Sequence, residues 1–182
     1  MSVAFKEWAL VCEALGEGRQ SIILRKGGIA EGRTGFAFRH HEFFLFPTWF
    51  HEQLSKTTLP SDTPLSNPSE SEIEIHYAAS VEWTRLIKSF DVLQRLSEFH
   101  ILQESVVKER FDYDDLKGIH LAFLRIFRID PPQRFAYQKK FGGCRSWVEL
   151  PDFGQCTMVS VISDEEHARR RAKIEELLPS ND

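Results

Sequence analysis

The stretch IHLAFLRIFRI, residues Ile119–Ile129, gives the strongest indication of secondary structure in this chain. Branched and aromatic side chains dominate it, which is typical of a buried β-strand. The dipeptide Pro131–Pro132 follows directly, and proline has no N–H to give to a sheet. We therefore expect a strand that ends at these prolines.

Shorter segments on both sides predict more strands and several helices. In residues 72–79 the apolar residues Ile73, Ile75 and Tyr77 alternate with polar ones, as in a half-buried strand. Further strands are expected at residues 21–25, 34–38, 43–46, 147–150 and 157–162. Helices are expected at residues 3–15, 49–56, 91–99 and 104–110, and from Ser163, with Glu166 as its capping-box partner, to about residue 178. Together these predict an α+β fold with a mixed or antiparallel sheet, for which a partly closed barrel is one possible form, and flanking helices.

The length and the polar segment 57–71 bear on domain organisation. A chain of 182 residues is close to the usual size of one domain, so we expect a single domain over residues 1–182. Residues 57–71, TTLPSDTPLSNPSES, are rich in Ser, Thr and Pro, which is typical of a linker or long loop. This segment would separate an N-terminal module, residues 1–56, from a larger α+β module, residues 72–182. The first module is small for independent stability, so we expect the two to pack together.

Charge and cysteine content restrict the partners and the compartment. A net charge of −4 gives no general attraction to nucleic acid or to an anionic membrane, so such a contact would need a local patch. The three cysteines are odd in number and far apart, which favours free thiols in a reducing compartment. The start, MSVAFKEWAL, has no long apolar core. We expect a cytoplasmic protein without a membrane partner; the sequence indicates no oligomeric state.

A basic and aromatic segment runs from Arg19 to His51. Cations can contact phosphates and aromatic faces can stack on bases, so this mixture suits single-stranded nucleic acid. However, Phe36 and Phe38 would share one face of a strand, and so would Phe44 and Phe46. This periodicity favours an aromatic core with the cations on a solvated face.

Within this segment, the run Arg25-Lys26-Gly27-Gly28 is a candidate anion site. Two glycines let backbone N–H groups approach an anion, and the cations would help to hold it. The run is not a P-loop, and a plain hairpin turn is the more common role of Gly-Gly between strands. His51 is a candidate acid, base or anion contact, but no metal-ligand spacing accompanies it, so no metal site is expected.

Cys144 and Trp147 follow the turn Gly142–Gly143. Neighbouring cations, including Arg145, would lower the pKa of the thiol and favour reactivity. A buried structural cysteine is the more usual case, and we favour it here. The face of Glu72, Glu74 and His76 is interpreted as solvated, since it lacks the lysine expected of a metal-nuclease strand.

Two arginines, Arg110 and Arg125, complete the candidate set. Arg125 lies within the apolar strand, where an unpaired charge is costly, so it needs an internal carboxylate or a ligand. Asp112, Asp114 and Asp115 are the expected partners. Fingerprints of Rossmann proteins, kinases, nucleophile-elbow hydrolases, EF-hands and zinc fingers do not occur, and no cofactor is expected.

Several segments together resemble the bacterial family DUF1802, a domain of unknown function. They are FKEWALVCEAL, ILRKGGI, FFLFPTWFHEQ, KERFDY, FLRIFRI and GGCRSWVEL, and the resemblance runs from about Phe5 to Leu150. The family brings no activity that could be carried over; an association with restriction–modification contexts favours a role related to nucleic acid. The matching segments imply a shared cleft among Arg25, Lys26, Gly27, Gly28, Pro47, Thr48, His51, Arg110, Arg125, Cys144 and Trp147.

Two hypotheses of different classes follow. The first is an accessory protein that binds or processes nucleic acid, or binds another anionic ligand, in a cleft that uses Arg25–His51 with Arg110, Arg125 and Arg145. The alternative is a module without catalysis that binds a protein or a small ligand. A catalytic Cys144 is a third hypothesis, and whether the protein is an enzyme stays open.

Overall fold

Two long antiparallel strands, β4 (Glu72–Ile87) and β5 (Ile119–Ala136), form the centre of the computed structural model, which describes residues 2–26, 36–64, 71–114, 118–152 and 154–179. The other strands are β1 (Val3–Trp8), β2 (Ile22–Arg25), β3 (Glu42–Thr48), β6 (Trp147–Glu149) and β7 (Thr157–Ser160). The sheet order is β2-β5-β4-β3-β1-β6, with β7 also paired to β5. Strands β1 and β3 run parallel and the other pairs antiparallel, so the sheet is mixed.

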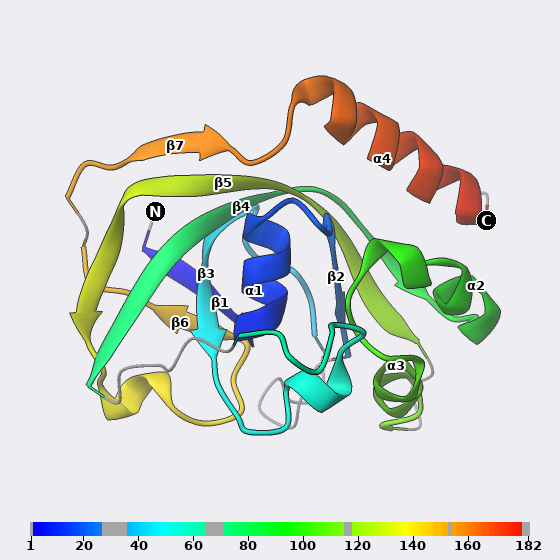
Figure 1. Ribbon diagram of the computed structural model, residues 1–182, viewed down its shortest axis with the longest axis horizontal. Coiled ribbons are helices and arrows are strands. Elements are labelled where there is room, and N and C mark those ends of the chain that lie inside the picture. Colours follow the sequence, from blue (N-terminus) through cyan, green and yellow to red (C-terminus); the bar gives the residue numbers. More distant parts are fainter. Residues whose placement is uncertain (1, 27–35, 65–70, 115–117, 153, 180–182) are drawn as a thin grey trace.

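The sheet is strongly curled, and its two ends approach each other (Figure 1). In a flat sheet, β2 and β6 would lie five strand spacings apart, roughly 24 Å at about 4.8 Å each. Instead, Arg25 of β2 donates a hydrogen bond to Ser146, directly before β6, over 3.0 Å. The α+β fold with a mixed, partly closed barrel is therefore confirmed. We call the gap between β2 and β6 the seam.

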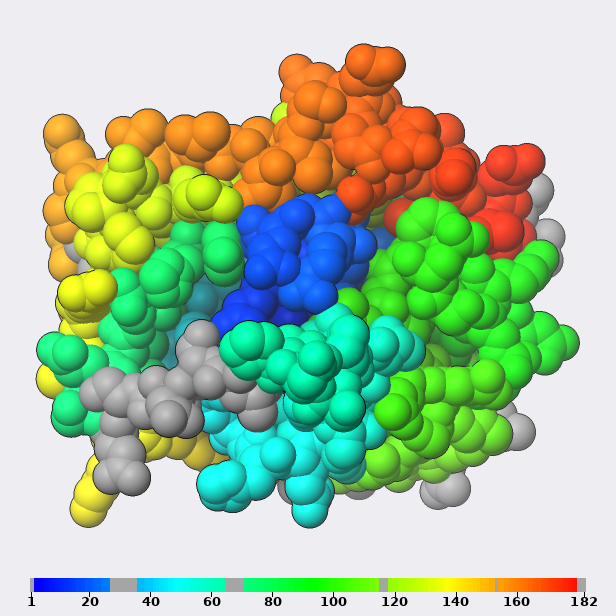
Figure 2. Space-filling model, viewed as in Figure 1, coloured from blue at the N-terminus to red at the C-terminus, as the bar shows by residue number. Residues whose placement is uncertain are grey.

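In the described residues the α-helices are α1 (Ala9–Gly16), α2 (Phe90–Arg95), α3 (Glu104–Phe111) and α4 (Asp164–Leu177), and short 3-10 turns lie at Leu54–Lys56, Ser97–Phe99 and Lys139–Phe141. Helix α1 is almost wholly buried and packs against β1, β3, β4 and β5. Helix α4 lies across the outer surface beyond β7 (Figure 2). The Ser163 hydroxyl accepts from the Glu166 N–H at its start, which is one half of the predicted capping box. The Glu166 carboxylate accepts instead from Arg169 and Arg170.

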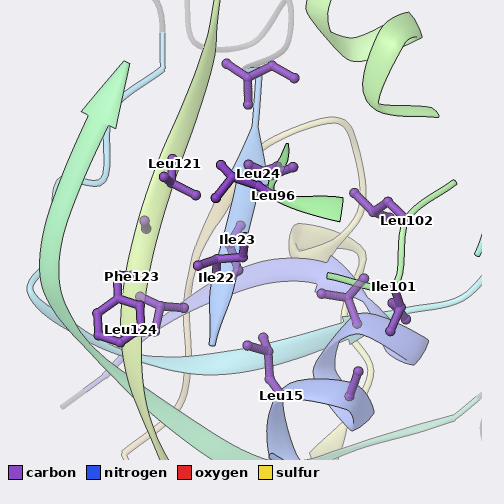
Figure 3. Packing of buried hydrophobic residues seen from close by; sticks show 14 of the residues in the cluster. Leu15, Ile22, Ile23, Leu24, Leu96, Ile101, Leu102, Leu121, Phe123 and Leu124 are labelled. Carbon is purple, nitrogen blue, oxygen red and sulfur yellow. The ribbon is translucent and has the colours of Figure 1, made fainter. Parts of the chain in front are cut away.

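The core is apolar and aromatic. Leu15 of α1, Ile22–Leu24 of β2 and Phe123 of β5 pack in one cluster (Figure 3). Phe36, Phe43, Phe44 and Phe46 are buried, which confirms that most of the N-terminal phenylalanines belong to the core. Residues 36–38 nevertheless form no strand, and residues 34–35 lie outside the described residues.

The expected helix over residues 3–15 is wrong for its first half, where Val3–Trp8 forms strand β1. β1 is paired on both sides, by β3 and β6, and its two faces are both covered. Its apolar residues therefore occur without the alternation that identifies a half-exposed strand. Tertiary pairing overrides the helical spacing here.

Pro131 and Pro132 do not end β5, which continues to Ala136. The ladder with β4 is irregular there: register passes from Tyr77 opposite Arg128 to Ile75 opposite Gln133. Prolines that face such an irregularity remove no ladder hydrogen bond. Pro47 likewise lies inside β3, one residue before its end.

Three other expected elements differ in detail. The helix at residues 49–56 is reduced to turns and the 3-10 turn Leu54–Lys56. The helix expected at residues 91–99 is shorter: α2 ends at Arg95, and the 3-10 turn Ser97–Phe99 follows it. In the segment 57–71, Thr57 is buried and forms a β-bridge with Leu102, while residues 65–70 lie outside the described residues.

None of the described helices is long and apolar enough to cross a bilayer.

Candidate functional site

A small pocket lies where the end of β2 meets α3. Its volume is about 120 Å³, and its lining residues are Arg25, Lys26, Glu109, Arg110 and Tyr113. We call it the arginine cleft. Three cations and one carboxylate form it, with the exposed Tyr113 ring at its rim.

Arg25 is held at the seam by contacts from both sides. It donates to the Ser146 hydroxyl over 3.0 Å, and its guanidinium lies 5.4 Å from the centre of the Phe5 ring. Lys6 of β1 donates to the carbonyls of Phe141 and Gly143, each over 2.8 Å. Strand β1 thereby positions the loop that carries Ser146, and the loop positions Arg25.

Arg110, near the end of α3, connects three elements. It donates to the Leu24 carbonyl over 2.7 Å, which satisfies an acceptor at the open edge of β2. Its guanidinium lies 4.7 Å from the centre of the Trp8 ring. Its Nη2 lies 4.0 Å from Oε1 of Glu7, a side chain only 1% exposed. Among the described residues, the second oxygen of Glu7 has no hydrogen-bond partner.

Three cations line this cleft, and the carboxylates Glu109, Asp114 and Glu7 lie beside them. Burial lowers the pKa of Arg110, Glu7 opposes that change, and the charge of Arg25 lowers the pKa further. Lys26 pairs with Asp114 over 2.9 Å and donates to the Gly118 carbonyl over 3.1 Å. Arg25 and Arg110 line one pocket and repel each other, so an anion between them would be stabilised.

His100 is a buried histidine beside this group. Its Nδ1 accepts from the Leu102 N–H over 3.2 Å, and its Nε2 has no partner among the described residues. Burial lowers the pKa of His100 to about 4, and Arg110 adds to the effect. The imidazole is therefore neutral at pH 7.

We expect the free energy of unfolding to fall as the pH drops from about 6.5 toward about 4. The unfolded chain binds the His100 proton at its ordinary pKa of 6.5, above the folded value of about 4, so acid favours unfolding. The full difference amounts to roughly 3 kcal/mol. Urea unfolding across this pH range would measure it. His100→Asn, which keeps an acceptor for the Leu102 N–H, should flatten the slope, and the exposed His51→Asn should not. If the pH dependence of the free energy of unfolding were unchanged in His100→Asn, His100 would not be its source.

The structure brings only part of the predicted set together. Arg25, Lys26 and Arg110 meet in the arginine cleft. Arg145 is exposed. Burial lowers the pKa of Lys6, and the charges of Arg145 and Arg25 lower it further. His51 is exposed in the turn after β3 and does not line the cleft. Gly27 and Gly28 lie outside the described residues.

Arg125 lies elsewhere, and its predicted partners are wrong. Its guanidinium pairs with Asp164, the first residue of α4. Asp112 pairs instead with Lys108, and Asp114 with Lys26. The alternating pattern of β5 turns Arg125 away from the seam, so it contributes to the docking of α4.

Cys144 is exposed, so its expected burial is wrong. The tight turn Gly142–Gly143, fixed by Lys6, leaves the thiol outside the core. Trp147, in contrast, packs on Phe5 and Phe43 with ring centres 4.9 and 5.1 Å apart. Its role in the described structure is packing.

The polar face of β4 is solvated, as predicted. Glu72 and His76 are exposed, and Glu74 pairs with Arg134 over 2.8 Å. Among the described residues no group of His, Cys, Asp or Glu could hold a metal ion.

Sequence reasoning missed Glu7, Trp8 and Tyr113. Glu7 and Trp8 were assigned to a helix, in which neither had any reason to approach Arg110. A carboxylate among Ala4, Phe5 and Ala9 was the available signal, since a charge in an apolar stretch needs a partner when it is buried.

The comparisons with known proteins match this chain to one family model over residues 4–173, described as Domain of unknown function (DUF1802). The chain belongs to the DUF1802 family. The resemblance noted from the sequence is thereby confirmed, and the family description assigns no activity. A comparison with curated proteins finds no match.

Solved structures give a more distant similarity. A crystal structure of ASCH from Zymomonas mobilis is 10% identical, with a TM-score of 0.46, and the match covers 94% of this chain and 93% of that one. Two mutant ZmASCH proteins from the same organism have TM-scores of 0.48 at 10% and 11% identity, covering 94% of this chain and 94% and 96% of theirs. A similarity this distant assigns no activity.

Proposed function

We propose that this protein binds single-stranded nucleic acid, with a backbone phosphate in the arginine cleft. The observation that carries the proposal is the convergence of Arg25, Lys26 and Arg110 on one pocket, although they come from the end of β2 and from α3. The chain as a whole has a net charge of −4, so this local concentration of cations is not a consequence of composition.

The size and shape of the cleft support an anion the size of a phosphate group. A volume of about 120 Å³ is below the range of roughly 300–1,000 Å³ typical of drug-sized ligands. Guanidinium groups are planar forks that match phosphate oxygens, and Arg25 and Arg110 offer two of them. A phosphate that enters between them would relieve their mutual repulsion.

The rim adds an aromatic contact that a phosphate alone would not use. Tyr113 lines the cleft and is 55% exposed. Trp8, under the guanidinium of Arg110, packs edge-on against the partly exposed Phe50, with ring centres 5.0 Å apart. Exposed aromatic faces beside cations are the combination by which proteins stack unpaired bases.

The test is fluorescence anisotropy with a labelled, unstructured RNA of about 12 nucleotides. We expect binding that weakens between about 50 and about 200 mM salt, with a slope of log K on log salt near −2 for three phosphate contacts. Arg25→Ala with Lys26→Ala should weaken binding at least about tenfold and reduce the slope by more than about 1. Tyr113→Ala should weaken it about tenfold by loss of stacking.

A matched control removes two cations from α4. Arg169 and Lys173 are exposed and lie outside the arginine cleft, so Arg169→Ala with Lys173→Ala should leave affinity within about twofold. Thermal unfolding of each variant confirms that it is folded. No binding at about 50 mM salt, or equal losses in the control pair, would overturn the proposal.

A further inference from the structure

A second pocket lies on a different part of the sheet, where the β4–β5 ladder is irregular. Between the pairs Tyr77–Arg128 and Ile75–Gln133, one residue of β4 lies opposite residues 129–132 of β5. The strand β5 must therefore leave the ladder and return to it. Strand β7 pairs with residues 127–130 of β5 on the other side, and Figure 2 shows the orange β7 segment beside the yellow-green part of β5.

The resulting cavity has a volume of about 470 Å³, within the usual range for small-molecule sites. We call it the β5 pocket. Its polar lining residues come from β4 and β5, and its apolar lining residues come from β5 and β7. The lining residues are His76, Tyr77, Arg128, Ile129, Asp130, Pro132 and Val159.

Tyr77 packs closely against helix α1 at the wall. The hydroxyl end of its ring lies against Gly16, the last residue of α1, so closely that a Cβ there would come within 2.0 Å of the ring. Only glycine leaves room for this ring position. Burial raises the pKa of Tyr77, Arg128 opposes this, and Glu17 and Glu13 add to it, so the phenol keeps its proton and can donate.

Two opposite charges line the same pocket without neutralising each other. Neither the Arg128 guanidinium nor the Asp130 carboxylate forms a hydrogen bond or ion pair with another residue in the described parts of the chain. A ligand that carries both a negative and a positive group could bridge them. A simple anion would meet the nearby carboxylates Asp130, Glu13 and Glu17.

The remaining wall is apolar. Ile129 and Pro132 form part of it, and Val159, 58% exposed on the edge strand β7, forms the rim. Covering this exposed apolar side chain with a ligand would remove apolar surface from water, which favours binding. A hydrocarbon or aromatic group on the ligand therefore has a surface to occupy beside the two charges.

We propose that the β5 pocket binds a free α-amino acid with an apolar side chain. Arg128 would hold the carboxylate, Asp130 the ammonium group, and Ile129, Pro132 and Val159 the side chain. This site is independent of the arginine cleft and of the nucleic-acid proposal.

The test is titration of the full chain with L-phenylalanine, followed by backbone NMR shifts and calorimetry. We expect saturable binding, with shifts centred on residues 76–77, 128–132 and 159. Two analogues probe the charges: 3-phenylpropanoate lacks the ammonium group and phenethylamine lacks the carboxylate. Each should bind at least about tenfold more weakly, since each loses a charge-assisted hydrogen bond.

Two variants test the charged groups of the pocket. Arg128→Gln and Asp130→Asn should each weaken L-phenylalanine binding at least about tenfold, and both side chains are exposed enough for the fold to tolerate the change. Arg25→Ala should leave it unchanged, and Arg128→Gln should leave RNA affinity unchanged. The proposal is overturned by no shift at about 10 mM ligand, by equal affinity for either analogue, or by unaltered binding in Arg128→Gln.

Discussion

Replacing Phe5 with alanine is expected to lower the free energy of unfolding by about 3–5 kcal/mol. Phe5 is completely buried in the middle of β1. Its ring contacts Phe36, Phe43 and Trp147, with centres 6.0, 5.6 and 4.9 Å away. These neighbours lie on separate segments, so they cannot collapse together into the space, and a cavity should remain.

Urea unfolding monitored by circular dichroism would measure the loss. The matched control is Phe50→Ala, because Phe50 is 36% exposed and has one described ring neighbour, Trp8. Its truncation should change stability by about 1 kcal/mol or less. A loss below about 1 kcal/mol for Phe5→Ala would mean that β1 is not the centre of the core.

Removing Arg110 is expected to destabilise the fold by about 3–5 kcal/mol, an effect of similar size. Glu7 is 1% exposed, and Arg110 is the cation beside it in the described structure. Arg110→Ala would leave that carboxylate buried without a counter-charge and the Leu24 carbonyl without its donor.

A double-mutant cycle isolates the interaction. Glu7→Gln removes the buried charge, so Arg110→Ala should cost less in that background, by at least about 1 kcal/mol. As a control, Arg169→Ala breaks a surface pair with Glu166 and should cost less than about 1 kcal/mol. Strictly additive effects of the Glu7 and Arg110 variants would show that the two side chains are not coupled.

This expected cost has a consequence for the nucleic-acid test. Arg110 both lines the arginine cleft and neutralises Glu7, so loss of binding in its variants would mix two effects. Arg25, Lys26 and Tyr113 line the same cleft without contacting Glu7 in the described structure. They are therefore the positions that report on binding.

Local patterns predicted some elements well. The helix Glu104–Phe111, the cap at Ser163 and the strands that contain Phe43–Phe46 and Ile119–Ile129 follow from residue types and periods within a few positions. Each depends on interactions between residues close in sequence, or on burial of a continuous apolar face. The prediction failed at Val3–Trp8, because a strand covered on both faces has no alternation and its partners lie far along the chain.

The candidate sites divide in the same way. By itself the sequence determined the α+β class, the aromatic core, and Arg25, Lys26 and Arg110 as notable cations. Curling of the sheet decided which cations meet. It brought Arg25 of β2 against Ser146 in the loop before β6, and Arg110 of α3 lies against Leu24 of β2 and Trp8 of β1. Arg125 pairs elsewhere, with Asp164. The irregular β4–β5 ladder forms a pocket that no sequence motif predicted. Both depend on pairing between residues distant in sequence, which composition and local period do not encode.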